Sequence, residues 1–511
     1  NSPMKNLRII LLIFAFNSAV FADLEQPIQL DAGQITGTSM ESGVQAFLGI
    51  PFASPPVGDL RWREPQPVIP WSGVKVMDRK GPDCMQSRNT NLMSEDCLYL
   101  NVWTGAQSSA DKLPVLVWIH GGGWRFKATY DGDAFADNGA ILVSVNYRMN
   151  AFGWMAHPAL SEESENGVSG NYGVLDHLAA LEWVQNNIER FGGDKDNVTI
   201  FGESAGGGSM YSLLATSKAE GLFHKVISES TWINPDNVSD LKSHNGFMES
   251  AEKMGSNAVA SKLQELGIDG GNLLDEMRLL SADEVMQLSV PVSLIVDGWL
   301  YDKPPIQTFH EGSQIKVPIM SGYNNGEGLG YVSRQQNVPK TIAQQREKRA
   351  ARLGDSGGEL SELYVADNEE NLIDVEIDFI SDEMFVRASR ELALAGVRAN
   401  QDTFLYVFGR NAQDPENLAP HYAEVKYVFN KLENTFSKED QDLAELMNSY
   451  WVQFARTGNP NGDGLPYWPE FDLESQTHQF LDINISQGTL DRKERLDAMD
   501  TYLRARYGLV Q

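Results

Sequence analysis

The sequence predicts an α/β fold in which one large, mostly parallel sheet is flanked by helices. Between about residues 110 and 410, apolar β-branched runs alternate with segments of helical periodicity, which is the pattern of parallel strands joined by crossover helices. The 511 residues are 42% hydrophobic, which is enough for a large buried core. Since no repeat or long Gly/Ser linker divides the chain, we expect one domain over residues 23–511.

Six apolar runs are the expected strands of this sheet. Between the second and third of them, one helical face is apolar, which predicts a helix packed on the sheet. Its apolar positions are Val174, Leu178, Leu181, Val184 and Ile188, and the expected strands cover residues 113–119, 141–147, 197–201, 225–227, 317–321 and 403–408.

Two regions depart from this alternation. Residues 23–110 are richer in Gly and Pro and lack the helical period, so short antiparallel strands are expected at the sheet edge. Residues 335–400 are charged and helical in pattern. We expect them to form a cap-like insertion over the active site, within the same domain.

The N-terminus has the pattern of a signal peptide. Residues 1–3 resemble a cloning remnant ahead of Met4, and Lys5 and Arg8 then lead into the apolar run 9–16. Val20 and Ala22 are small residues at the spacing that a signal peptidase needs, so we predict cleavage after Ala22. The mature protein is then expected to be secreted or periplasmic. The alternative is a membrane anchor, but the apolar run is shorter than the ~20 residues a spanning helix needs.

The charge balance excludes some partners. Lys and Arg total 41 against 70 Asp and Glu, a formal net charge of −29. Such a surface repels phosphate backbones and anionic lipid, so no nucleic acid is expected as a partner. Two explanations of the acidity stay open: solubility, including in a saline medium, and attraction of cationic substrates.

The only two cysteines are predicted to form a disulfide. Cys84 and Cys97 have twelve residues between them. In an exported protein such a pair indicates a disulfide, and closing a loop of this size contributes about 3 kcal/mol in the chain-entropy model.

A nucleophilic serine is predicted at Ser204. The pentapeptide GESAG at residues 202–206 follows the apolar run 197–201 and precedes a helix-compatible segment. The pentapeptide alone also fits an ordinary glycine-rich turn, but this strand–turn–helix setting is typical of a nucleophile elbow. We expect the neighbouring Glu203 to line the substrate pocket.

A glycine loop follows the expected strand 113–119. The sequence HGGG at residues 120–123 lets backbone N–H groups converge on one point, as an oxyanion hole requires. We expect the N–H groups of Gly122, Gly123 and Ala205 to form it. A phosphate-binding loop would need a following Lys-Ser/Thr, which is missing. Together the loop and the elbow predict an α/β-hydrolase fold that needs no metal or cofactor.

The base and the acid are sought after the serine, because this fold places them in the order serine, acid, histidine. Of eight histidines only His421 and His478 lie late enough, and His421 follows the expected strand 403–408. We interpret His478 as solvent-exposed. Glu327 stands between two glycines after the strand 317–321 and is the candidate acid, with neighbours such as Asp302 left open.

Longer motifs resemble the type-B carboxylesterases, the family that includes the cholinesterases. The resemblance runs from about residue 27 to the C-terminus and rests on GNYGVLD at 170–176, FGGD at 191–194 and EDCLYLNV at 95–102. It implies a serine esterase that hydrolyses carboxylic esters of small molecules through a covalent acyl-enzyme.

The resemblance also assigns individual residues. It places Glu327 as the acid and His421 at the head of the histidine motif. It further implies two structural ion pairs, Arg61 with Glu95 and Arg148 with Asp176. Ser230 corresponds to a serine that lies near the triad in this family.

Departures from the cholinesterases bear on the substrate. The loop between the two cysteines is short and has no tryptophan, so a cation-π platform for choline is absent there. We expect Trp232, Trp124 and Trp299 to add bulk to the pocket, which favours short to medium acyl chains, although core packing is the alternative for each. Bulky or natural-product esters, choline esters, and a non-enzymatic adhesion role are the competing functions. The oligomeric state is not predicted.

Overall fold

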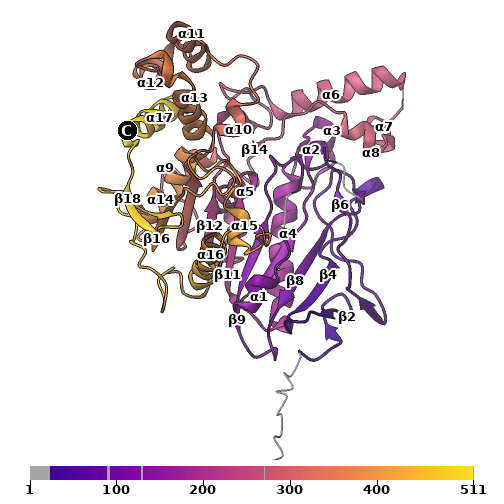
Figure 1. Ribbon diagram of the computed structural model, residues 1–511. Coiled ribbons are helices and arrows are strands. Elements are labelled where there is room, and N and C mark those ends of the chain that lie inside the picture. The colour runs from indigo at the N-terminus through magenta and orange to yellow at the C-terminus, as the bar shows by residue number, and fades with distance from the viewer. Residues whose placement is uncertain (1–23, 89–91, 128–129, 270, 510–511) are drawn as a thin grey trace, which may run out of the picture.

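The computed structural model describes residues 24–88, 92–127, 130–269 and 271–509 (Figure 1). The predicted signal peptide, residues 1–22, lies outside these ranges. Within them, eleven strands form one sheet in the order β18-β17-β16-β15-β12-β11-β9-β10-β8-β4-β3. No helix in the described ranges is long and apolar enough to cross a membrane.

The centre of the sheet is parallel, as the sequence predicts. The strands from β17 to β10 are parallel to their neighbours, while β8, β4, β3 and β18 pair antiparallel at the edges. The central strands are β9 (Leu113–Ile119), β10 (Ile141–Val145), β11 (Gly193–Glu203), β12 (Lys225–Glu229), β15 (Ile319–Asn324), β16 (Thr403–Phe408) and β17 (Thr477–Leu481). The edge strands are β3 (Thr38–Ser39), β4 (Gln45–Pro51), β8 (Tyr99–Thr104) and β18 (Ser486–Thr489). The expected strands are therefore confirmed, with ends displaced by a few residues.

Helices cover both faces of the sheet, and its central strands are therefore buried on both sides. In β9, Val115 and Val117 pack into the cluster that contains α4 (Tyr172–Asn187), whereas Leu116 and Trp118 pack into the cluster that contains α16 (Lys438–Thr457). The alternation follows from the two-residue repeat of a strand. The predicted helix over residues 174–188 is α4, with its apolar positions buried. Also on these faces are α1 (Asp133–Asp137), α5 (Ala205–Leu214) and α15 (Val425–Val428).

The segment predicted as a cap divides into two parts. Helices α11 (Ile342–Leu353), α12 (Gly358–Leu363) and α13 (Leu372–Ser381) form a cluster with α17 (Lys493–Arg506), and this cluster has its own small core. In contrast, α14 (Arg387–Arg398) packs directly on β15 and β16. The insertion predicted over residues 335–400 therefore ends near residue 386, because α14 is one of the helices that flank the sheet.

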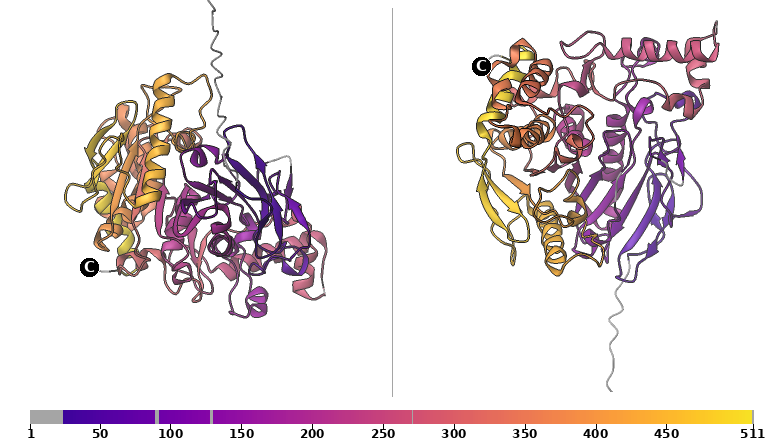
Figure 2. Two further views of the ribbon diagram at one scale, coloured as in Figure 1. Left: turned by 90° about the horizontal axis from the view of Figure 1, so that it is seen from below. Right: turned by 45° about the horizontal axis from the view of Figure 1, so that its top comes forward.

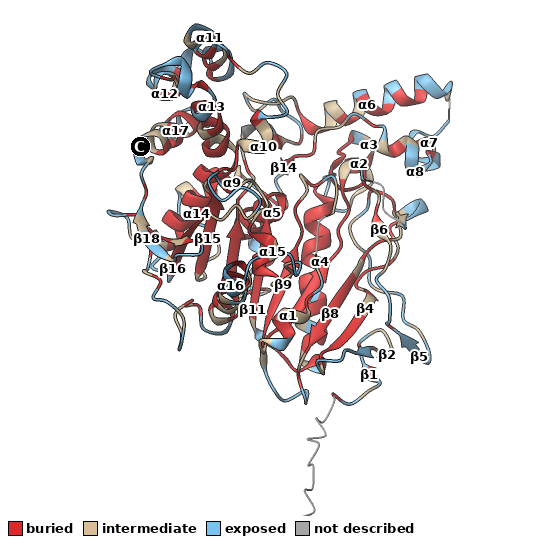
Figure 3. Cartoon of the chain, viewed as in Figure 1, coloured by how far each residue is buried: buried red, intermediate tan, exposed pale blue. Residues whose placement is uncertain are grey.

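Two groups of outer helices extend beyond the sheet. The right-hand view of Figure 2 shows α6 (Ala251–Leu266) and the α11–α13 group on opposite sides of the molecule. Exposed residues gather on the outer helices, whereas the sheet is buried (Figure 3). The remaining helices are α2 (Asn150–Trp154), α3 (Pro158–Glu163), α7 (Leu273–Leu279), α8 (Ala282–Met286), α9 (Pro305–His310) and α10 (Leu329–Val332). Small sheets form from β1 (Ile28–Gln29), β2 (Gln34–Thr36) and β5 (Val74–Val76), from β6 (Asp83–Cys84) and β7 (Met93–Ser94), and from β13 (Val238–Asp240) and β14 (Leu294–Val296).

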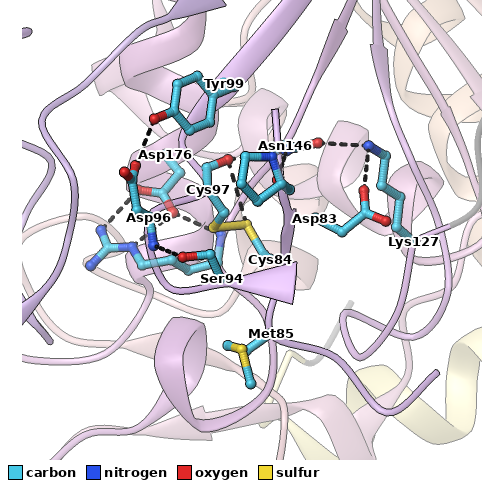
Figure 4. Close-up of a disulfide and its surroundings, with 12 residues drawn as sticks. Asp83, Cys84, Met85, Ser94, Asp96, Cys97, Tyr99, Lys127, Asn146 and Asp176 are labelled. Carbon is cyan, nitrogen blue, oxygen red and sulfur yellow. Dashed lines mark hydrogen bonds and ion pairs between the residues drawn. A yellow bond between two sulfur atoms is a disulfide. The ribbon is translucent and has the colours of Figure 1, made fainter. Parts of the chain in front are cut away.

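The predicted disulfide between Cys84 and Cys97 is confirmed (Figure 4). The segment beside it is held by further polar contacts. The Lys127 ammonium lies 2.9 Å from the Asp83 carboxylate and 2.8 Å from the Asn146 side-chain oxygen. These contacts join the cysteine loop to the segment that follows the glycine loop.

Both predicted ion pairs are present and bidentate. Nε and Nη2 of Arg61 contact the carboxylate of Glu95 at 2.8 and 2.5 Å. Nε and Nη2 of Arg148 contact Asp176 at 2.9 and 2.8 Å, and both of these side chains are buried. Asp176 lies on α4, so the second pair fixes this helix to the loop after β10.

Candidate active site

Ser204 occupies a sharp turn between β11, which ends at Glu203, and α5, which begins at Ala205. Its backbone has φ 58° and ψ −118°, a conformation that costs energy for a residue with a side chain. A Cβ at Gly202 or Gly206 would lie 2.4 or 2.1 Å from the carbonyl oxygen of Ile119. The flanking glycines are therefore required by the close approach of the neighbouring strand.

Ser204, His421 and Glu327 form one continuous hydrogen-bonded chain. The Ser204 Oγ lies 2.9 Å from Nε2 of His421, and Nδ1 of His421 lies 2.5 Å from Oε2 of Glu327. Glu327 follows β15 and is fully buried, and His421 lies in the loop between β16 and α15. The structure thus brings together the three residues that the sequence places in the order serine, acid, histidine.

The second oxygen of Glu327 is also occupied. Its Oε1 accepts hydrogen bonds from the Ser230 hydroxyl at 2.5 Å and from the Asn324 backbone N–H at 2.8 Å. Two donors on this side fix the carboxylate, so that Oε2 faces the imidazole. Ser230 therefore touches Glu327, at the place that the family resemblance implies.

The His421 ring is held between aromatic side chains. It stacks on Phe385 with ring centres 4.3 Å apart, and Tyr331 meets it edge-on at 5.8 Å. Phe385 is fully buried in a short π-helical stretch between α13 and α14. Sequence reasoning missed both aromatic residues, because neither stands in a motif or next to a triad residue in the chain.

Three further buried carboxyl groups surround the triad: Glu203, Glu229 and Glu424. Oε1 of Glu203 lies 3.2 Å from Nε2 of His421, and neither oxygen of Glu203 accepts a hydrogen bond from the described residues. Burial, and then the nearby Glu424 and Glu327, raises the pKa of Glu203 well above its ordinary value. Burial therefore favours the uncharged form of Glu203, and the Nδ1 side of the imidazole faces Glu327.

Glu424 was not singled out by sequence reasoning, although it stands in the histidine motif. Its Oε2 accepts from the Asn324 amide at 2.6 Å, and its Oε1 lies 3.3 Å from the Ser230 hydroxyl. Burial, and then the neighbouring Glu327, raises the pKa of Glu424 to about 7. Ser230 thus stands between two carboxyl groups, one of which titrates near neutral pH.

The glycine loop lies against the elbow. A Cβ at Gly121 would be 2.4 Å from the carbonyl oxygen of Glu203, so only glycine allows this approach. Gly122 and Gly123 have φ of 102° and 63°, and both line the same cavity as Ser204. Ala205 is the first residue of α5, where backbone N–H groups have no partner within the helix. All three predicted oxyanion donors therefore lie next to the serine.

The serine opens into a cavity of about 660 Å³. Glu203 and Trp232 line it, as predicted. Trp124 does not line it, because its side chain is fully buried behind Trp232, with ring centres 5.2 Å apart. The Trp124 indole N–H donates to Ser209 Oγ at 3.1 Å, which makes Trp124 a core residue. Its expected place in the pocket is thereby corrected.

Two other expectations are also corrected. Trp299 lines a separate, smaller hollow of about 220 Å³ together with Trp62 and Tyr172, and Lys218 packs over its ring at 4.2 Å. His478, interpreted as solvent-exposed, is buried in β17. It is not part of the lining of the serine cavity. Among the described residues, no three or more His, Cys, Asp or Glu side chains are grouped so that they could hold a metal ion.

The fold and this geometry together define a serine hydrolase with the α/β-hydrolase fold. The chain belongs to the carboxylesterase family, whose model, described as "Carboxylesterase family", matches residues 25–501. It is a carboxylic ester hydrolase.

Individual relatives agree with this assignment. The chain is 33% identical to the fumonisin B1 esterase of Sphingopyxis macrogoltabida, over 88% of this chain and 85% of that protein. It is 34% identical to the medium-chain fatty acyl-CoA hydrolase precursor of Anas platyrhynchos, over 96% and 95%. Among solved structures, a PNB esterase superposes with a TM-score of 0.77 at 30% identity, covering 92% of this chain and 99% of the esterase.

Proposed function

We propose that Ser204 is the nucleophile of a two-step ester hydrolysis, with His421 as general base and acid and Glu327 as its orienting carboxylate. The observation that carries this proposal is the unbroken contact from Ser204 through His421 to Glu327, at 2.9 and 2.5 Å, with Ser204 and His421 in the lining of one cavity.

In the first step His421 Nε2 takes the proton of the Ser204 hydroxyl while Oγ attacks the ester carbonyl carbon. The carbonyl oxygen becomes an oxyanion, which the N–H groups of Gly122, Gly123 and Ala205 are proposed to bind. His421 then gives its proton to the leaving alcohol, and an acyl-enzyme remains on Ser204. One such oxyanion donor is typically worth about 10²–10³ in rate.

In the second step water replaces the alcohol. His421 takes a proton from the water as it attacks the acyl carbonyl, and returns that proton to Ser204 Oγ as the carboxylic acid leaves. The imidazolium that forms in each step donates from Nδ1 to Glu327 at 2.5 Å, whereas Glu203 lies 3.2 Å from Nε2 and its raised pKa favours the uncharged form. Glu327 therefore supplies the compensating charge.

The acyl group is proposed to be short to medium in length. Trp232 lines the cavity, and its backbone N–H donates to the Ser204 carbonyl at 3.0 Å, so the indole stands close to the nucleophile. The names of the relatives refer to fumonisin B1, cocaine and pyrethroids, which do not share one acyl group or one alcohol. The proposed limit on the length of the acyl chain therefore rests on Trp232 alone.

The protein is further proposed to act outside the cytoplasm, as one catalytic domain over residues 23–511. The signal-peptide pattern before residue 23 supports export. So does the Cys84–Cys97 disulfide, since disulfides persist in oxidising compartments.

The test measures kcat/KM for p-nitrophenyl esters from acetate to palmitate with the parent enzyme, Ser204→Ala and Trp232→Ala. Activity that is greatest for short chains in the parent, absent in Ser204→Ala, and shifted towards longer chains in Trp232→Ala supports the proposal. Full activity of Ser204→Ala would end the mechanistic assignment. A preference of the parent for palmitate would refute only the acyl limit.

A further inference from the structure

Four arginines line the serine cavity, in a protein whose net charge is −29. They are Arg88, Arg125, Arg334 and Arg352, and all four are exposed at the cavity. A cavity whose lining carries an excess of one sign of charge focuses the field of that sign on the ligand that enters it. The sign here is opposite to that of the protein as a whole.

Arg88 and Arg125 come from two loops that are fastened together. The Ser87 backbone N–H donates to the Arg125 carbonyl at 3.2 Å, and the Arg88 guanidinium lies 3.6 Å from the centre of the Phe126 ring. The Cys84–Cys97 disulfide and the contact of Lys127 with Asp83 anchor the bases of the same two loops (Figure 4). Both arginines are therefore held near the glycine loop.

Arg334 and Arg352 come from the other part of the lining. Arg334 follows α10, its Nε donates to the Gly330 carbonyl at 2.5 Å, and its guanidinium lies 5.3 Å from the centre of the Tyr331 ring. Tyr331 in turn contacts the ring of His421. Arg334 is thus one aromatic side chain away from the catalytic imidazole.

Carboxylates in the lining neutralise only one of the four arginines. Arg352 pairs with Asp236 at 2.5 Å and with Glu383 at 2.8 Å. Burial raises the pKa of Glu203, the third acid in the lining, which favours its uncharged form. In the described part of the chain, no carboxylate forms an ion pair with Arg88, Arg125 or Arg334. Within the described ranges, Arg88, Arg125 and Arg334 are therefore unpaired, and the four arginines outnumber the two acids, Asp236 and Glu383, that pair with Arg352.

We propose that this site takes esters that carry a free carboxylate, bound by Arg88, Arg125 and Arg334 while Ser204 attacks the ester carbonyl. Guanidinium groups hold carboxylates through paired N–H donors, which gives both charge and direction. The inference rests on the proposed function and narrows its substrate class from esters in general to anionic esters, such as half-esters of dicarboxylic acids.

The test compares esters that differ in one terminal group. On the acyl side, monoethyl glutarate replaces the terminal methyl of ethyl pentanoate by a carboxylate, and ethyl 4-(trimethylammonio)butanoate replaces it by a cation. On the alcohol side, 4-acetoxybutanoate is compared with butyl acetate. The measured quantity is the ratio of kcat/KM for the anionic ester to that for its neutral partner. A ratio above one for the acyl-side pair or for the alcohol-side pair identifies the part of the substrate that the arginines bind.

Five variants and a salt series make the test specific. Arg88→Gln, Arg125→Gln and Arg334→Gln are measured singly and together, and Arg79→Gln is the matched control, since Arg79 is exposed outside the cavity. An exposed ion pair is worth up to about fivefold. We therefore expect each single variant to lower the ratio by about two- to fivefold and the triple variant by about tenfold or more. Arg79→Gln leaves the ratio unchanged, and added NaCl lowers it in the parent.

A ratio below one on both sides, or a ratio that the triple variant leaves unchanged, would overturn the inference. Faster hydrolysis of ethyl 4-(trimethylammonio)butanoate than of ethyl pentanoate would also overturn it. These results leave the proposed function standing as long as hydrolysis depends on Ser204. A parent enzyme that cleaves none of the esters through Ser204 would instead refute the proposed function itself.

Discussion

Glu327→Gln is the substitution whose effect follows most directly from the hydrogen bonds at the site. Glutamine keeps the shape of the side chain but turns one acceptor oxygen into a donor. On the Oε1 side, Ser230 and the Asn324 N–H both donate, so the amide oxygen must stay there. The new NH₂ group then faces Nδ1 of His421 and forces that nitrogen to become the acceptor.

The imidazole is thereby held in the wrong tautomer, with its proton on Nε2 facing the Ser204 hydroxyl. It can no longer take the serine proton. In other serine hydrolases a change of this kind lowers kcat by about 10⁴. At 1.36 kcal/mol per factor of ten, this is a loss of about 5.4 kcal/mol of transition-state stabilisation. We expect the same order of loss here, with KM changed far less than kcat.

The assay is kcat for p-nitrophenyl butyrate at pH 7.5, with urea unfolding to check that each variant is folded. Glu229→Gln is the control, because Glu229 is a buried acid that accepts from the Trp451 indole at 2.7 Å and makes no hydrogen bond to His421. Its kcat should stay within about tenfold of the parent. If Glu327→Gln also stays within tenfold, or if the two variants lose activity equally, the tautomer argument is refuted.

Three other predictions concern stability and pH. Asp176→Asn leaves the buried Arg148 without its charge partner, so the free energy of unfolding in urea should fall by about 3–5 kcal/mol, and a fall below 1 kcal/mol would contradict a structural role for the pair. Cys84→Ser with Cys97→Ser opens the loop and should cost about 3 kcal/mol, measured the same way, whereas an unchanged midpoint would mean that other contacts hold the loop. The pKa of Glu424 in the folded protein is raised to about 7. The contribution of its protonated carboxyl to the free energy of unfolding is therefore fully present below the pKa of the unfolded chain and is lost as pH rises through 7. The stability of Glu424→Gln relative to the parent should therefore rise between about pH 4.5 and 7 and then level off, and a flat difference over this window would speak against the raised pKa.

The parts of the site that sequence could predict are those encoded in contiguous residues. The GESAG turn shows Ser204 because its glycines are required within two residues of it, and the glycine loop is equally local. The disulfide followed from a count of two cysteines. His421 needed an argument from chain order, since nothing in its immediate neighbours specifies an imidazole.

The parts that sequence could not predict depend on contacts between distant segments. Trp124 and Trp299 looked equivalent to Trp232 as large aromatic residues, but only the contact of the Trp124 ring with Trp232, from the segment after β12, shows that Trp124 is covered. Phe385 reaches His421 from a helix between α13 and α14. In the fold, the strands followed from their apolar runs, whereas α14 has the same charged, helical pattern as the helices before it.

The arginines of the cavity illustrate the same limit. Arg88, Arg125 and Arg334 come from loops scattered over more than 240 positions of the sequence, and each alone is an ordinary surface residue. A total charge of −29 favours attraction of cations rather than anions. Only the folded chain shows that the local charge at the serine has the opposite sign.

Labelling with an organophosphate tests most directly that Ser204 is the nucleophile. The enzyme is treated with diethyl p-nitrophenyl phosphate, released p-nitrophenol is counted against enzyme, and the modified residue is located by peptide mass spectrometry. We predict one equivalent released per chain, complete loss of esterase activity, and the phosphoryl group on Ser204 alone, with no labelling of Ser204→Ala. A label on another residue that accompanies the loss of activity, or full activity after Ser204 is labelled, would contradict the assignment.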